Sequence, residues 1–143
     1  MDKGLDFYIC FCGHREPQTP HNTQHYLQST HESCHLKHGQ QVSTAPRRLL
    51  QLIPGLELVE LTEADWCCGS AGIYNITQPE MSMKLLDRKM AHIGTTTAGV
   101  VATGNPGCTI QIQHGAKRQG LAIKVVHPIS LLAAAYREEQ EAK

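Results

Sequence analysis

Several features that point to common functional classes are missing from this 143-residue sequence. The chain carries no excess of charge, because 13 lysine and arginine residues balance 13 aspartate and glutamate residues. Nothing therefore favours binding to nucleic acid or to an anionic membrane surface. No apolar run approaches the roughly 20 residues that a membrane-spanning helix needs. The N-terminus also lacks the pattern of a secretory signal, which predicts a cytoplasmic protein.

Two families of binding motif are absent as well. The dinucleotide fingerprint G-x-G-x-x-G has no match, since Gly69 and Gly72 have the wrong spacing and the segment 104–107 runs into Cys108. The main cysteines do not form the paired Cys-x-x-Cys units that are typical of zinc sites. Without an export signal, the six cysteines are expected to be reduced thiols and not a disulfide framework.

The most unusual stretch that is present covers residues 65–72, where two adjacent cysteines lie between a tryptophan and a glycine-rich run. Adjacent cysteines rarely bond to each other, because a disulfide needs a larger separation of the α-carbons than one peptide allows. As thiolates, Cys67 and Cys68 could both face one metal centre if the backbone turned sharply. Gly69 and Gly72 permit such a turn, since glycine adopts positive φ angles without steric cost.

Strand-like and helix-like segments alternate along most of the chain. This order predicts an α/β fold, a single domain with a short parallel sheet flanked by helices. Functional groups in such sheets gather in the loops that follow the carboxyl ends of the strands. Residues 31–40 are expected to be one such loop, dense in potential ligands. The expected strands are 25–30, 56–61, 98–103 and 121–126, and the expected helices are 46–53, 77–94, 109–118 and 128–136.

The best-defined element is the expected helix over residues 77–94. Thr77 and Glu80 have the spacing of a capping box at its N-terminus. Helical spacing then divides the side chains between a core face and a solvent face. The core face is predicted to hold Met81, Leu85, Leu86, Met90 and Ile93, and the solvent face Ser82, Lys84, Asp87, Arg88 and Lys89.

The two ends of the chain read poorly as folded elements. Residues 1–26 are expected to be a poorly ordered N-terminal segment, residues 27–137 the folded domain, and residues 138–143 a frayed tail. The pattern Cys10-x-Cys12-x-His14 is a weak signal for a partial metal site, and a loose tail is the favoured reading.

Three expected loops carry cysteines and follow strand ends on one edge of the sheet. Four thiolates match the ligand count of an iron–sulfur cluster or of a structural zinc. One alternative is a set of buried structural thiols, and another is a thiol enzyme with Cys67 or Cys68 as nucleophile and a loop histidine as base. Four thiols at one edge favour a metal or cluster site. They are Cys34, Cys67, Cys68 and Cys108.

The segments around these cysteines resemble the cysteine-rich "CCG" domain of the glycolate oxidase iron–sulfur subunit, the lactate-utilisation protein and the B subunit of heterodisulfide reductase. They are similar above all to the C-terminal repeat of the glycolate oxidase subunit, over about residues 29–137. The resemblance implies that residues 27–137 are a CCG domain. The matching segments are Ser33-Cys34-His35-Leu36-Lys37-His38-Gly39-Gln40, Trp66-Cys67-Cys68-Gly69-Ser70-Ala71-Gly72-Ile73-Tyr74-Asn75 and Thr103-Gly104-Asn105-Pro106-Gly107-Cys108.

The resemblance implies that the four cysteines are ligands of a 4Fe–4S cluster. The fullest form of the family motif ends in Cys-x-x-Cys, and here Asn105 stands at the first of these positions. Asn105 is a candidate hydrogen-bond donor to the cluster or a residue that shapes the turn. His35 and His38 are likewise candidate donors to the cluster or solvent-facing loop residues.

The function that the resemblance implies is electron transfer. The resembled subunit passes single electrons from a flavin-bearing subunit, which oxidises glycolate to glyoxylate, towards a quinone-like acceptor. It also contains ferredoxin-type modules and a second repeat, so this chain looks like its C-terminal part, encoded alone or truncated. The implied role is a component of a glycolate dehydrogenase-type oxidoreductase that is not catalytic alone.

The implied partners are a flavin-containing glycolate oxidase subunit and a ferredoxin-type iron–sulfur module. The expected location is cytoplasmic, and any contact with the inner face of the cytoplasmic membrane would come through the complex. The alternative function is a zinc- or thiol-stabilised interaction domain without a redox role. The sequence leaves open whether the parent substrate is glycolate, lactate or another 2-hydroxy acid.

Overall fold

The computed structural model describes residues 26–141. The predictions on residues 1–25, including those on Cys10, Cys12 and His14, lie outside the described residues, as do residues 142–143. The domain boundaries expected from the sequence stay predictions.

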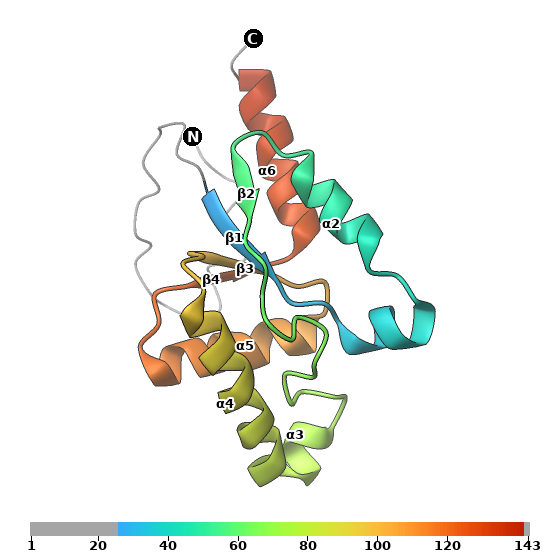
Figure 1. Ribbon diagram of the computed structural model, residues 1–143, viewed down its shortest axis with the longest axis vertical. Coiled ribbons are helices and arrows are strands. Elements are labelled where there is room, and N and C mark those ends of the chain that lie inside the picture. The colour runs from blue at the N-terminus through green and yellow to red at the C-terminus, as the bar shows by residue number, and fades with distance from the viewer. Residues whose placement is uncertain (1–25, 142–143) are drawn as a thin grey trace.

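Four parallel strands form the centre of the fold in the order β2-β1-β3-β4 (Figure 1). Gln28 of β1 lies opposite Leu58 of β2 on one side and Val100 of β3 on the other. This sheet, flanked by helices, confirms the predicted fold class. The strands are β1 Tyr26–Thr30, β2 Leu56–Leu58, β3 Val100–Ala102 and β4 Lys124–Val126.

The helices cover both faces of the sheet. The crossover from β1 to β2 runs towards one edge of the sheet, and those from β2 to β3 and from β3 to β4 run towards the other. Because parallel crossovers are right-handed, α4 and α5 lie on the face opposite α2. Accordingly α2 contacts α6, and α4 contacts α5 (Figure 1). The helices are the π-helix η1 His35–Gly39, α2 Thr44–Gln51, α3 Tyr74–Thr77, α4 Pro79–Thr95, α5 Pro106–Gln119 and α6 Pro128–Glu141.

Two local expectations were wrong. The segment expected to be a loop contains η1, because Leu36 N–H and Lys37 N–H both donate to the Ser33 carbonyl and start a helical turn. The capping box of α4 does not form either. Thr77 instead closes the preceding α3 by donating its hydroxyl to the Ile73 carbonyl, and Gln78 takes the N-cap position without a side-chain hydrogen bond.

The buried face of α4 also differs from the expected one. Met81 is 46% exposed, whereas Ser82 and Lys89 are each 2% exposed. The reason is that α4 packs against α5 and against the loop that carries Cys67 and Cys68, so polar groups from that loop replace part of the apolar core. The main core contains Leu61, Ala64, Cys68, Leu86, Met90, Ile93, Val101, Cys108, Ile112, Ala116 and Val125.

The strand order reverses between β1 and β3, which are neighbours in the sheet. In open α/β sheets, the crevice at such a reversal, beyond the carboxyl ends of the strands, is the usual binding site. His31 follows β1 directly, and its backbone N–H donates to the Ala102 carbonyl of β3 at 2.8 Å. Cys34 therefore leaves the sheet beside the segment that leads from β3 to Cys108.

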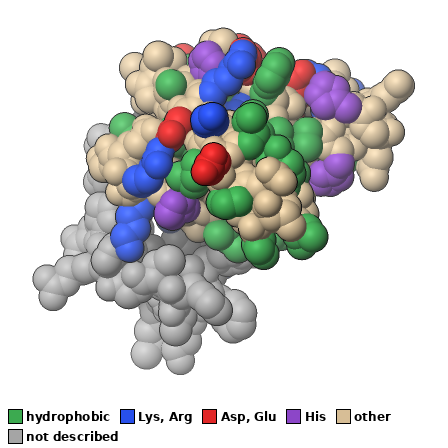
Figure 2. Space-filling view, turned by 90° about the horizontal axis from the view of Figure 1, so that it is seen from below, with side chains coloured by type: hydrophobic (Ala, Val, Ile, Leu, Met, Phe, Trp, Pro, Cys, Tyr) green, Lys and Arg blue, Asp and Glu red, His purple; other side chains and the backbone are tan. Residues whose placement is uncertain are grey.

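The outer surface carries apolar side chains close to this edge. Figure 2 shows hydrophobic side chains gathered on the lower face of the molecule, the face on which α3 lies in Figure 1. Ile73, Ile76 and Met81 are exposed there, at 68%, 76% and 46%. Within residues 26–141, none of the helices combines the length and the apolar character needed to cross a bilayer.

Candidate metal centre

The turn at Gly69 fixes the position of the two adjacent cysteines. Gly69 has a φ angle of +90°, and a Cβ atom there would lie 2.3 Å from the Ser82 carbonyl oxygen. The Gly69 carbonyl accepts a hydrogen bond from the Ser82 hydroxyl at 2.8 Å, and Gln111 of α5 donates to the same hydroxyl oxygen at 3.0 Å. The loop is thus held tightly against α4 and α5, because only glycine fits this approach.

Cys108 lies in the first turn of α5. The sequence predicted that this helix begins at residue 109, but it begins at Pro106, which suits the first helical position. Asn105 is the N-cap, and its Oδ1 accepts a hydrogen bond from the Cys108 N–H at 3.1 Å. The side chain of Asn105 therefore shapes the turn that carries Cys108.

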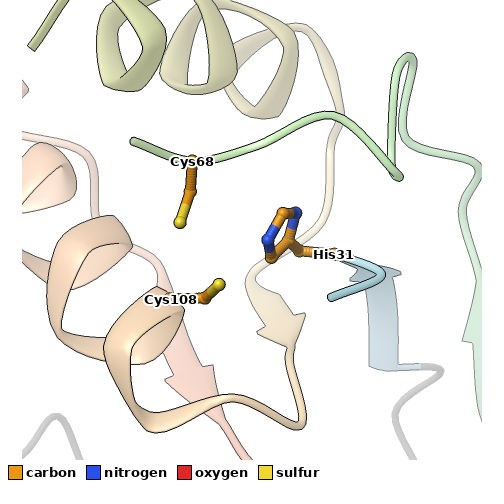
Figure 3. A group of neighbouring side chains, drawn as sticks. All are labelled: His31, Cys68 and Cys108. Atoms are coloured by element: carbon orange, nitrogen blue, oxygen red, sulfur yellow. The ribbon is translucent and has the colours of Figure 1, made fainter. Parts of the chain in front are cut away.

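Three buried side chains from separate segments meet at the carboxyl edge of the sheet (Figure 3). They are His31 after β1, Cys68 in the loop after β2, and Cys108 at the start of α5. One ligand atom of each lies within 4.8 Å of the others. Three donor atoms this close are suited to binding one metal centre.

Cys34 and Cys67 lie at the outer side of this group. Both are half-buried, and they line one surface pocket together with His38, Asp65 and Trp66. The Lys37 ammonium holds their two segments together, since it lies 3.1 Å from Glu32 Oε2 and 3.2 Å from Asp65 Oδ2.

The sulfur atoms influence one another's protonation. The Cys68 thiol donates towards Cys108, which lowers the pKa of Cys108 and, with burial, raises the pKa of Cys68 to about 11. Contact with Cys68 is also the main cause that raises the pKa of Cys67. The charge of Cys34 has the opposite effect to Cys68 and raises the pKa of Cys108. The group thus holds protons that a metal would displace, because only thiolates bind metals.

A buried cation lies beside the thiols. Lys89 of α4 donates from Nζ to the Glu63 carbonyl, in the loop before the cysteines. Burial lowers the pKa of Lys89, while Cys68 and Cys108 act in the opposite direction. The sequence placed Lys89 on the solvent face of α4, since a lysine at that spacing normally faces water. In the fold Lys89 is 2% exposed, and its charge and those of the cysteine thiolates act on one another.

The sequence interpretation missed His31 as a site residue. The signal was its place directly after a strand, at the start of the loop that the sequence showed to be dense in potential ligands. Burial, with the Lys89 charge as the second cause, lowers the pKa of the His31 ring to about 4. The two histidines that were proposed instead, His35 and His38, are exposed. His38 lies 3.9 Å from Asp65 Oδ2.

The donor set fits an iron–sulfur cluster. The four cysteines in the described part of the chain are free thiols, none joined in a disulfide. Neither ring nitrogen of His31 has a hydrogen-bond partner within residues 26–141. Buried polar atoms without partners are rare in folded proteins, so this edge is built for an additional group.

The fold and site define a family. Residues 29–113 match the cysteine-rich domain family CCG, and the chain belongs to this family. It is 51% identical over 106 residues to a protein named "probable glycolate oxidase iron-sulfur subunit" of Bacillus subtilis, a match that covers 73% of this chain and 24% of that protein.

Two further relatives are similar to this chain over more than two thirds of its length. Lactate utilization protein A of Oceanobacillus iheyensis is 36% identical over 102 residues, covering 71% of this chain and 42% of the relative. The B subunit of the CoM/CoB fumarate reductase of Methanothermobacter marburgensis is 36% identical over 110 residues, covering 76% of this chain and 22% of the relative. The chain thus spans less than half the length of these curated relatives.

Proposed function

We propose that this chain is an iron–sulfur electron-transfer component of a glycolate oxidase-type complex. In this proposal Cys34, Cys67, Cys68 and Cys108 bind a 4Fe–4S cluster. The observation that carries it is the meeting of buried thiols from distant segments beside a buried cation, in a chain 51% identical to part of an iron–sulfur subunit. An iron–sulfur cluster, when bound, accepts and releases single electrons.

The residues of the chain have three tasks in this role. The Gly69 turn and the Asn105 cap fix the positions of Cys68 and Cys108. The thiols give up their protons on binding, and Lys89 supplies a positive charge that offsets part of the negative charge of the thiolates. The loop and α4 exclude water from the inner side, since Cys68 is fully buried.

The partners belong to the same proposal. A flavin-containing subunit that oxidises glycolate to glyoxylate would deliver electrons, and a ferredoxin-type module would pass them towards a quinone-like acceptor. The support is that this chain spans 24% of the glycolate oxidase relative, so most of that protein has no counterpart here. A cytoplasmic location is proposed with this role.

Iron and acid-labile sulfide analysis of anaerobically prepared protein tests the proposal. We expect a brown protein with iron and sulfide in equal amounts, and at least a fivefold loss of both in Cys68→Ala. The matched control is the double variant Cys10→Ala/Cys12→Ala, which should keep its iron. A colourless protein with one zinc would replace the proposal with a zinc-stabilised interaction domain, and an absence of both metals would refute any metal role.

A further inference from the structure

The imidazole of His31 is buried in an unusual way. Its exposed fraction is 2%, and neither Nδ1 nor Nε2 forms a hydrogen bond of normal geometry among the described residues, although the Ala64 carbonyl is near enough to act on the pKa of the ring. A histidine in a protein core normally has a partner for at least one nitrogen, because an unsatisfied buried polar group costs about 1–3 kcal/mol. The ring therefore has unused binding capacity.

The surroundings of the ring identify a partner for one nitrogen. A ring nitrogen and the Sγ atoms of Cys68 and Cys108 all lie within 4.8 Å of one another (Figure 3). Nitrogen and sulfur ligands of one tetrahedral metal lie roughly 3.5–3.8 Å apart, from their usual bond lengths, and ligands of separate irons in one cluster lie farther apart. The observed separation allows either arrangement after small side-chain movements. The backbone stays in place, because His31 N–H is bound to the Ala102 carbonyl.

The second nitrogen has a backbone carbonyl nearby. The Ala64 carbonyl acts on the His31 ring as a hydrogen-bond acceptor does, since it raises the pKa of the ring against the larger effect of burial. Histidines that bind metals usually donate their other N–H to water, a carbonyl or a carboxylate. The position of the ring, close to both the sulfur group and this carbonyl, matches that arrangement.

The side-chain oxygen of Asn105, the other candidate ligand beside these cysteines, is already engaged in a hydrogen bond. Asn105 stands at the position where the fullest family motif has another cysteine, but its Oδ1 accepts the Cys108 N–H. His31 is the buried residue next to Cys68 and Cys108 whose donor atoms are unused. We propose that His31 binds the metal centre through a ring nitrogen, beside Cys68 and Cys108. The inference rests on the proposed function, and because each of the four irons takes one protein ligand, the imidazole replaces one of the two half-buried thiolates, Cys34 or Cys67, as the fourth ligand.

Pulsed electron paramagnetic resonance tests this ligand directly. The reduced, cluster-loaded full chain is compared with the same protein labelled with ¹⁵N in histidine only. We expect a nitrogen hyperfine coupling that changes on labelling, disappears in His31→Gln and persists in His35→Gln, the matched exposed control. A loaded wild-type protein without the coupling would overturn the proposal, as would a coupling that persists in His31→Gln.

Cobalt binding separates this proposal from the proposed function. If the wild type takes up no iron and sulfide, the cluster assignment fails, yet Co²⁺ titration of the metal-free protein still tests His31. We expect Co²⁺ to bind at least tenfold more weakly to His31→Gln than to wild type or His35→Gln. Equal affinities would refute the ligand role. If His31→Gln does not fold, as judged by circular dichroism, His31→Cys replaces it and should bind Co²⁺ with stronger sulfur-to-cobalt absorbance than wild type.

Discussion

Replacing Gly69 by alanine should damage both the fold and the metal centre. Two costs follow from the structure. An alanine at a φ angle of +90° has a strained backbone, which costs about 1–3 kcal/mol. Its Cβ would also lie 2.3 Å from the Ser82 carbonyl oxygen. That oxygen belongs to a helix backbone, so overpacking adds about 1–3 kcal/mol. The expected loss in free energy of unfolding is therefore about 4 kcal/mol.

Gly72 provides the matched control. It lies in the same loop with a φ angle of +62°, but a Cβ atom there would have nothing within 4 Å. Gly72→Ala should therefore lose only the backbone part, about 1–2 kcal/mol. Urea unfolding of the reduced, metal-free proteins, followed by circular dichroism, measures both losses. A loss of about 4 kcal/mol leaves a measurable transition in a domain of ordinary stability, about 5–15 kcal/mol.

The comparison of the two variants can refute the reasoning. If Gly69→Ala and Gly72→Ala lose the same free energy within about 0.5 kcal/mol, the close approach to Ser82 does not limit the loop. A second readout is metal uptake. Gly69→Ala should bind Co²⁺ more weakly than Gly72→Ala, because a displaced Gly69 moves the adjacent Cys68 away from Cys108.

Three smaller effects are expected. Asn105→Ala should lower the free energy of unfolding by about 1 kcal/mol in urea titrations, through loss of the α5 cap, while Asn105→Asp should keep it. The free energy of unfolding of the metal-free protein should fall by about 2 kcal/mol from pH 7 to pH 5, because the unfolded chain protonates His31 near pH 6.5 and the folded chain only near pH 4. In His31→Gln the free energy of unfolding should depend less on pH over this range. Lys89→Met should slow the alkylation of Cys108 at neutral pH. The reason is that the Lys89 charge, in addition to the contact with Cys68, lowers the pKa of the Cys108 thiol. Lys84→Met, on the exposed side of α4, should leave the rate unchanged. An unchanged rate in Lys89→Met would show that this charge does not reach the sulfur atom.

Local patterns were sufficient for the order of the elements. Short apolar segments, prolines at helix starts and glycines at helix ends are read from neighbouring residues, and they predicted a parallel sheet with helices on its faces. The same patterns put the cysteine segments after strand ends. They were insufficient at α4, where the helical period was right but the buried face was wrong. Which face is buried depends on the neighbours of the helix, and those neighbours come from distant segments.

The sequence by itself determined the α/β alternation, because it follows from the order of elements along the chain, and the same order placed Cys34, Cys67, Cys68 and Cys108 in segments that follow strand ends. Only the tertiary structure decided that Ser82 and Lys89 point inwards and that His31 lies beside Cys68 and Cys108. The residues next to them in the sequence do not distinguish these side chains from surface serines, lysines and histidines. Their roles arise from contacts between α4, α5 and the loop after β2, and such contacts exist only once the strands have paired in the order β2-β1-β3-β4.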